Sequence, residues 1–212
     1  MAAVFSYIFR FQIENFPLYL ILGTVMFDLM NRGTTEAMSS IILAQSLIKK
    51  IRIEKMLFPL EKVLFELVNF AISLVAVFAV MAYFQVAPSV HAIWGLPLVI
   101  VLVTMFACGL GLLISALSVF FRDVMHLWTV LITAWTYATP IFYPFEAHDP
   151  WMQQIIWFNP MYHYITVFRD VMMWNTNPGA TEVLLCIGMA VVTFAVGFAV
   201  FRKTESKFIL YI

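Results

Sequence analysis

Four ionisable side chains are the first candidates for acid–base or metal chemistry in this sequence. They are His148, Asp149, His163 and Asp170. Imidazole and carboxylate groups move protons near neutral pH, so this set would suit a membrane-embedded enzyme that acts on lipid carriers. The first three residues follow no spacing that is typical of a metal site. We therefore predict no metal and no catalytic residue, and we keep the enzyme as an alternative.

The sequence lacks the motifs by which proteins bind nucleotide phosphates or activate a hydrolytic nucleophile. It contains no G-x-x-x-x-G-K-[ST] loop and no Gly-Lys pair, and neither H-E-x-x-H nor G-x-S-x-G occurs. An energy-dependent function would therefore need a partner that binds ATP and Mg²⁺, and no cofactor is expected on this chain. The formal net charge is zero, so we expect no nucleic-acid partner.

One predicted helix has a polar and aromatic face. Trp128 and Trp135 are seven residues apart and hence on the same side of a helix, and Thr129, Thr133 and Thr136 add hydroxyl groups. In a membrane helix such a face suits a water-filled path, and flat aromatic rings stack well against sugars. The same spacing also occurs in stripes that pack against neighbouring helices, so both interpretations stay open.

The elements that position these residues are predicted to be membrane helices. Residues 67–121 contain no Lys, Arg, Asp or Glu, and as α-helix they would extend roughly 80 Å, more than twice the roughly 30 Å of a bilayer's hydrocarbon core. The chain is 63% hydrophobic and 11% charged, whereas soluble domains are about 45–50% apolar and about 25% charged. The apolar runs lack the alternation of a transmembrane β-strand. We therefore predict an all-α, polytopic transmembrane helix bundle that forms a single domain over residues 1–212.

About five full spans and one partial span are expected. Met1–Phe9 is apolar but too short to cross a membrane, so it is interpreted as the end of a helix. The first full span is predicted to begin at Pro17 and to carry Asp28 and Arg32, which lie one turn apart and are expected to pair. The remaining spans are predicted near Leu64–Phe84, Trp94–Phe121, Val124–Tyr143 and Val183–Phe201.

The distribution of basic residues predicts the orientation. Nine of them fall in three segments, namely Lys49, Lys50, Arg52, Lys55 and Lys62 in one connection, Arg122 in a second, and Arg202, Lys203 and Lys207 in the tail. Threading the spans in order places all three segments on one side, which the positive-inside rule makes cytoplasmic. Residues 85–91 and 144–181 would then face outward, and the C-terminus would be cytoplasmic.

The basic connection from Leu47 to Lys62 mixes apolar side chains with five basic and two acidic ones. This pattern predicts a short amphipathic helix that ends before Pro59. One interpretation is an anchor on anionic lipid headgroups. The other is a docking helix that inserts into a groove on a soluble partner.

Two prolines, Pro140 and Pro144, lie at the end of the predicted span Val124–Tyr143. Both cannot lie inside a regular helix, because each removes a hydrogen-bond donor and clashes with the preceding turn. The helix should therefore stop or bend there. The aromatic segment that follows fits either an interfacial belt or short re-entrant or surface-lying helices that gate an external exit.

Small residues recur at intervals of four in the predicted span Trp94–Phe121. They are Ala107, Gly111 and Ser115, with Gly109 beside them. Such a stripe lets two helix backbones approach closely where lipid gives no hydrophobic drive for association. It predicts close packing inside the bundle or at a dimer seam.

Taken in order, these segments resemble the permease subunit of a type 2 ATP-binding-cassette exporter, in the branch that moves polysaccharides, O-antigens and teichoic acids. The matching stretches are "ENFPLYLILG" from Glu14, "LIKKI" from Leu47, "GLGLLISALSVFFRDVMHL" from Gly109, "TPIFYP" from Thr139, "NPMYHYITVFRD" from Asn159, and a tail that ends in "VFRKTESKF". Each stretch is short, but their order and spacing extend over nearly all 212 residues.

The resemblance implies a multi-pass protein of the bacterial cytoplasmic membrane that exports a lipid-linked polysaccharide or a teichoic-acid-like polymer. A drug or lipid cargo is the alternative within the same superfamily. The resemblance also implies a homodimer with two copies of a separate soluble ATPase. It assigns the ATPase-docking loop to Lys49, Lys50, Arg52, Glu54 and Lys55.

The resemblance further implies a gate and a channel. The segment that matches Pro144–Trp174 would form short extracellular gate helices, with Pro140, Pro144, Asn159, Pro160, Arg169 and Asp170 as candidate gate residues. The aromatic residues expected to line the glycan path are Trp128, Trp135, Tyr137 and Tyr143. The family has an interfacial helix and most of a first span before the start of this match, so the chain is expected to lack that N-terminal part. The family also often carries proline where Glu54 stands.

Overall fold

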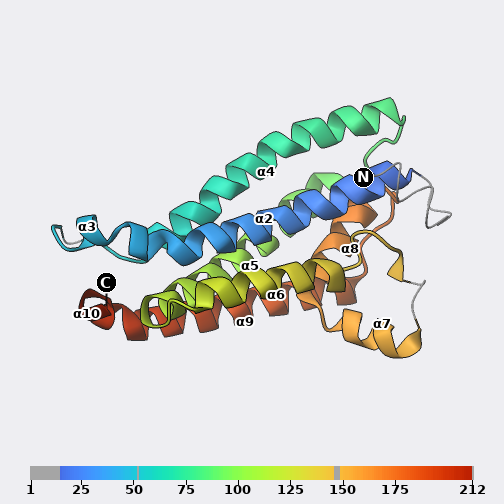
Figure 1. Ribbon diagram of the computed structural model, residues 1–212. Coiled ribbons are helices and arrows are strands. Elements are labelled where there is room, and N and C mark those ends of the chain that lie inside the picture. Colours follow the sequence, from blue (N-terminus) through green and yellow to red (C-terminus); the bar gives the residue numbers. More distant parts are fainter. Residues whose placement is uncertain (1–14, 52, 146–148, 212) are drawn as a thin grey trace. The chain divides into compact units, whose positions relative to one another are not determined.

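The computed structural model describes residues 15–51, 53–145 and 149–211. All regular elements among these residues are helices, as Figure 1 shows. The α-helices are α2 Phe16–Leu43, α3 Gln45–Ile48, α4 Leu57–Tyr83, α5 Ala92–Phe120, α6 Val124–Ala138, α7 Pro150–Trp157, α8 Pro160–Met172, α9 Ala180–Thr204 and α10 Phe208–Tyr211, and a 3-10 helix, η2 Glu205–Lys207, joins the last two. The prediction of a helical membrane bundle is confirmed, while the partial span at Met1–Phe9 lies outside the described residues.

The long helices extend beyond the apolar runs that predicted them. Helix α4 begins seven residues before Leu64, and α9 begins before Val183 and continues to Thr204. Hydrophobicity marks the part of a helix that can lie in lipid, whereas backbone hydrogen bonds carry the helix on through charged residues at its ends. Helix α6 is shorter than predicted and ends at Ala138, because Pro140 cannot continue it. The expected stop at the proline pair is therefore confirmed.

The predicted amphipathic helix between Leu47 and Pro59 is wrong. Helix α3 ends at Ile48, the described residues from Lys49 to Met56 are turns and irregular chain, and α4 begins at Leu57. Pro59 lies in the first turn of α4, where its missing N–H needs no partner. Extending the helix backwards would drive the proline ring into the carbonyl group of Lys55. The connection is therefore a loop rather than a helix.

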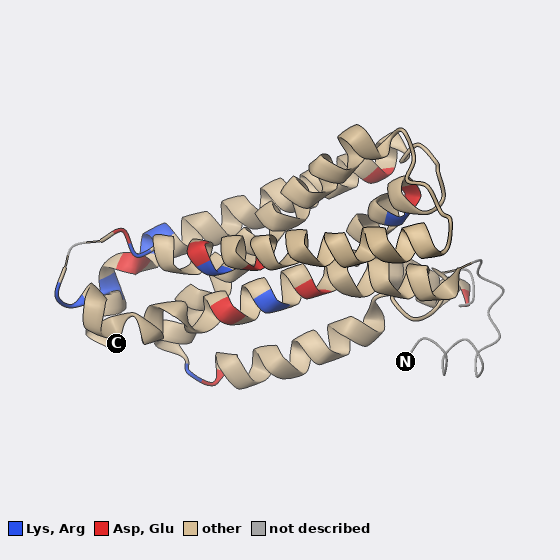
Figure 2. Cartoon of the chain, turned by 90° about the horizontal axis from the view of Figure 1, so that it is seen from above, with Lys and Arg blue, Asp and Glu red and all other residues tan. Residues whose placement is uncertain are grey.

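Three helices among the described residues are long and apolar enough to cross a bilayer. They lie at Leu57–Tyr83, Ala92–Phe120 and Ala180–Tyr211. Helix α2 has 28 residues but carries Asp28, Arg32 and Glu36, and α6 has 15 residues, or roughly 22 Å. Figure 2 shows the long charge-free stretches of helix in tan. The number of five full spans stays a prediction.

Contacts within the chain divide it into two compact units. Unit 1 comprises residues up to 27, 70–101 and 134–186, and unit 2 comprises residues 28–69, 102–133 and 187–212. The outward-facing connections predicted from the sequence, residues 85–91 and 144–181, both belong to unit 1. The described basic residues of the three predicted cytoplasmic segments all belong to unit 2: Lys49, Lys50, Lys55, Lys62, Arg122, Arg202, Lys203 and Lys207. This grouping agrees with the predicted threading of the helices.

Unit 2 is held together by an apolar cluster and by close helix contacts. The cluster contains Ile41, Ile48, Leu112, Ala116, Val119, Phe201 and Phe208. The small-residue stripe of α5 packs within the chain: a Cβ atom placed on Gly197 would lie 2.0 Å from the carbonyl oxygen of Gly109, and one on Gly111 would lie 3.0 Å from Cβ of Ala37. The predicted close packing is confirmed, and it joins helices of one chain.

Unit 1 is built around α8. This helix buries both apolar and polar side chains, including His163, Tyr164, Phe168 and Arg169. Its Phe168 ring lies 6.2 Å from that of Phe70 in α4. Helix α8 is thus a buried element rather than a surface-lying one, whereas α7 exposes Trp151, Ile155 and Trp157.

Candidate functional site

The loop between α3 and α4 meets the C-terminal tail in unit 2. The Lys55 ammonium group donates a hydrogen bond to the backbone carbonyl of Glu205 at 2.7 Å. The Arg202 guanidinium lies 3.4 Å from a Glu54 carboxylate oxygen and 3.0 Å from one of Glu205. These groups are partly exposed, with 43% of the Arg202 side chain and 58% of the Glu54 side chain accessible. Solvent-exposed charges in such a joint can exchange partners easily.

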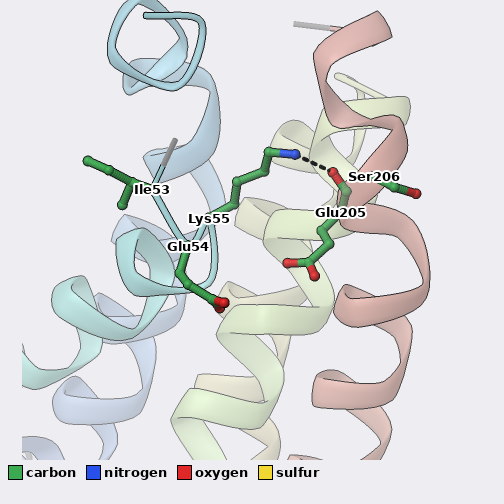
Figure 3. A pocket seen from close by; sticks show the side chains of 5 residues that line it. All are labelled: Ile53, Glu54, Lys55, Glu205 and Ser206. Carbon is green, nitrogen blue, oxygen red and sulfur yellow. Dashed lines mark hydrogen bonds between the residues drawn. The ribbon is translucent and has the colours of Figure 1, made fainter. Parts of the chain in front are cut away.

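A pocket of about 390 Å³ opens between the loop and the tail. Figure 3 shows its five lining residues, which are Ile53, Glu54, Lys55, Glu205 and Ser206. The pocket thus presents an exposed apolar side chain beside acidic, basic and hydroxyl groups. Such a mixed surface suits contact with a protein partner more than with an apolar ligand.

The structure places the five predicted docking residues differently. Glu54 and Lys55 join the tail, whereas Lys49 and Lys50 are exposed at the end of α3. Arg52 lies outside the described residues. Two basic side chains are therefore presented to solvent, and two charged side chains hold the loop against the tail.

Asn159 ties the start of α8 to the end of α6 in unit 1. Its Oδ1 accepts hydrogen bonds from the backbone N–H of Met161 at 3.0 Å and from Nε1 of Trp135 at 2.8 Å. Its Nδ2 donates to Oγ1 of Thr139 at 2.8 Å and to the carbonyl of Ala138 at 3.3 Å. The amide therefore uses two donor and two acceptor positions at once. It caps the N-terminus of α8, while Pro160 occupies the first helical position, where its missing N–H has no role.

Arg169 binds three backbone carbonyl groups from two separate segments. Its Nη1 donates to Pro140 at 2.9 Å, and its Nη2 donates to Tyr19 at 3.1 Å and Ile141 at 3.2 Å. The guanidinium carbon also lies 3.4 Å from the centre of the Tyr19 ring, a cation–π contact. Arg169 thus joins α8 to α2 and to the chain that follows α6.

The surroundings of Arg169 are adapted to a buried cation. The residue is 5% exposed, and burial lowers its pKa to about 10, so it remains charged at neutral pH. A Cβ atom on Gly23 would lie 2.5 Å from Nη2. Glycine at this position therefore leaves the space that the guanidinium fills.

His163 connects α8 to α7 and α9. Its buried ring places Nε2 2.7 Å from the carbonyl of Trp157 and Nδ1 2.5 Å from a carboxylate oxygen of Glu182. A carbonyl can only accept, so Nε2 carries a proton and one further proton is shared between Nδ1 and the carboxyl group. Both ring nitrogens are thus engaged within the chain, and His148, the other histidine of the enzyme alternative, lies outside the described residues.

Asp170 feels the charge of the same carboxylate. Its pKa is raised to about 6, chiefly by burial; a hydrogen bond from Thr176 opposes the shift, and the charge of Glu182 adds to it. The hydrogen bonds of Asn159 and Arg169 define one junction between the end of α6 and α8. It contains the predicted gate residues Pro140, Asn159, Pro160 and Arg169. Asp170 follows Arg169 in the sequence. Pro144 is half-buried between α6 and α7.

The four predicted path residues have different environments. Trp128 is 8% exposed, and Trp135 is half-buried and bonded to Asn159. Tyr137 is exposed, and its carbonyl accepts a hydrogen bond from the Tyr143 hydroxyl at 2.6 Å. The hydroxyl groups of Thr129 and Thr133 bond to carbonyl groups of their own helix. A role of these side chains in a glycan path stays a prediction.

Sequence reasoning missed four residues that complete these sites. Tyr19 and Gly23 complete the surroundings of Arg169, Glu182 pairs with His163, and Glu205 receives Lys55. The first two lie in the "ENFPLYLILG" stretch, which the resemblance had singled out as a unit. Glu182 stands in the first turn of an apolar helix, where an isolated carboxylate is a signal in itself.

Comparison with known proteins gives a consistent result. The family described as ABC-2 type transporter matches residues 1–173. Two relatives from Klebsiella pneumoniae, each named O-antigen export system permease protein RfbA, are 27% identical over 206 residues. A relative of the same name from Myxococcus xanthus is 26% identical over 208 residues. Each match covers 97% of this chain and 79% of the relative.

Proposed function

This chain belongs to the ABC-2 type transporter family, and from that premise we propose that it works as the membrane subunit of an ATP-driven polysaccharide exporter. It is a transport component of the permease type, similar over 97% of its length to O-antigen export permeases. The cargo is a lipid-linked polysaccharide that crosses the bacterial cytoplasmic membrane. Two copies of the chain assemble with a separate soluble ATPase. The family match together with these relatives carries the proposal.

The ATPase partner is supported by the arrangement of unit 2. The loop between α3 and α4 presents Lys49 and Lys50 to solvent, and Glu54 and Lys55 contact a tail that carries Arg202. This loop joins α3 to α4 and is also bonded to the tail, so a displacement of the loop can be transmitted to these helices. We assign this loop to the docking of the ATPase, with the basic residues on the cytoplasmic side.

Deletion of the gene in its host tests the cargo. We expect the surface polysaccharide to disappear and a polyprenyl-linked polymer to accumulate inside the cell, and the full-length gene should restore export. A teichoic-acid-like polymer found in that pool would correct the cargo class. Unchanged surface polymer and no internal accumulation would contradict the function.

Charge reversal tests the docking loop. We expect Lys50→Glu to reduce capture of the ATPase from detergent by about tenfold, which equals about 1.4 kcal/mol of binding free energy. Arg122→Glu is the matched control, because Arg122 is also exposed and basic but lies in a different connection. Equal capture by wild type and K50E, or equal losses in both variants, would contradict the assignment.

A further inference from the structure

Arg169 is an unusual residue in its surroundings. Among the described residues of unit 1 it is the one lysine or arginine, and the ion pairs found in the described chain do not include it. Its charge is therefore balanced by carbonyl dipoles and by the Tyr19 ring. Its Nε is buried and has no hydrogen-bond acceptor among the described residues.

A buried charge of this kind is a poor device for stability alone. Replacing buried ionic groups by apolar ones of similar size is often neutral or stabilising, and an unsatisfied buried donor calls for an explanation beyond packing. Arg169 nevertheless joins three segments that are far apart in the sequence, namely α2, residues 140–141 and α8. The guanidinium is held there by three hydrogen bonds to carbonyl groups rather than by one carboxylate.

The carbonyl groups that Arg169 binds lie where α6 has ended. Helix α6 stops at Ala138, and Pro140 and Ile141 continue as irregular chain. Carbonyl groups beyond a helix C-terminus lack partners from the helix, and the negative end of the helix dipole favours a cation. The guanidinium thus supplies donors to carbonyl groups that α6 itself leaves without a helical partner.

We propose that Arg169 is a positioning residue of the exit gate, which holds α8 on α2 and on residues 140–141 so that the gate is closed when no polymer passes. This inference rests on the proposed export function. The hydrogen bonds of Arg169 to neutral carbonyl groups can be released one at a time. Helix α8 can therefore leave the junction without separating an ion pair in an apolar environment. Gly23 belongs to the same device, because the guanidinium occupies the space above its Cα atom.

Replacement of the guanidinium tests the proposal in cells that carry the full-length gene and its ATPase partner. We expect Arg169→Met to raise the leak of a small hydrophilic dye through the membrane by at least about fivefold, while surface polymer falls. The amount of protein in the membrane and the capture of the ATPase should match wild type. Arg169→Lys keeps the charge and three donors, so it should restore part of the barrier, whereas Arg169→Gln should not.

A change at Gly23 tests the same contact from the other side. Gly23→Ala should open the leak, because its Cβ would lie 2.5 Å from Nη2. In an Arg169→Ala background the added methyl group should change the leak little, since the atom that it meets is gone. Gly188→Ala is the matched control, because a Cβ there would meet no atom within 4 Å.

The outcomes separate this inference from the function on which it rests. If wild type does not restore export in the deletion strain, the proposed function fails. If wild type exports but Arg169→Met leaves the dye leak unchanged, the gate role is wrong. A loss of protein from the membrane in both Arg169→Met and Arg169→Lys, in proportion to the loss of export, would make Arg169 a folding residue and would also overturn the proposal.

Discussion

The loop–tail joint of unit 2 and the α6–α8 junction of unit 1 use charge in opposite ways. In the joint, Arg202 and Glu54 face each other while both side chains remain about half exposed. In the junction, Arg169 is buried and is bonded to backbone carbonyl groups. Exposed ion pairs contribute about 0.2–1 kcal/mol and are screened by salt, whereas breaking one side of a buried polar contact costs about 1–3 kcal/mol. The joint is thus suited to exchange partners and the junction to hold a geometry.

The largest effect is expected at Asn159. Asn159→Ala removes the cap of α8 and four hydrogen bonds, and should lower the free energy of unfolding by about 2–4 kcal/mol. Thermal and denaturant unfolding of the purified protein in detergent measures this. Gln154→Ala is the control, because Gln154 is exposed on α7. Equal stability of the two variants would show that the junction does not hold α8.

A smaller loss is expected when Glu182 is removed. Glu182→Ala leaves Nδ1 of the buried His163 without its carboxylate, which should cost about 1–3 kcal/mol. Hydrogen exchange should also become faster in α8 and at the start of α9. Thr181→Ala changes an exposed neighbour in the same turn and should have an effect within about 0.5 kcal/mol. If exchange in α8 is unaltered by Glu182→Ala, the His163 contact does not fasten the helix.

The joint of unit 2 should respond differently to the loss of a charge. Arg202→Gln removes contacts to Glu54 and Glu205, yet the free energy of unfolding should change little because the groups are exposed. The difference from wild type should largely vanish in roughly 1 M salt. Lys203→Gln is the matched control on the next residue. A loss of stability as large as that of Glu182→Ala that persists in salt would remove the contrast between the two regions.

Local sequence features predict the helices of both regions, but they do not predict which side chains contact which partners. Pro140 predicted the end of α6, and the distribution of basic residues predicted that three connections lie on one side; their described basic residues all belong to unit 2. The amphipathic helix before Pro59 failed because a mixture of apolar and charged residues indicates a segment with two faces but does not by itself require a helical backbone, and the described residues from Lys49 to Met56 are turns and irregular chain. The partners of Arg169 could not be found from sequence because two of its three acceptors follow a helix end and the third lies in α2. Backbone carbonyl groups have no sequence pattern, so a site built from them is visible in coordinates alone.

The sequence also could not predict which polar side chains of α8 are buried. His163 and Arg169 face inward from a helix that lies between aromatic residues, and the pattern also fits an interfacial belt. The structure shows that the aromatic residues divide: Trp151 and Trp157 are exposed, whereas Tyr164 is buried and donates to the carbonyl of Cys186 at 2.9 Å. The sequence showed that this segment is rich in aromatic residues, but it did not predict which of them are exposed and which are buried.

The smallest effect is expected from the titration of Asp170. Its folded-state pKa is raised from 3.8 to about 6 by burial, with a further contribution from Glu182, so the fold favours the protonated form. Its contribution to stability is therefore complete below about pH 4 and is lost as the pH rises through about 6. Asp170→Asn should reduce this part of the pH dependence, measured as the unfolding midpoint between pH 4 and 8. Because the carboxyl group is partly exposed, the change should be small beside that of Asn159→Ala. A pH profile in Asp170→Asn that falls as steeply as in wild type would assign the titration to another group.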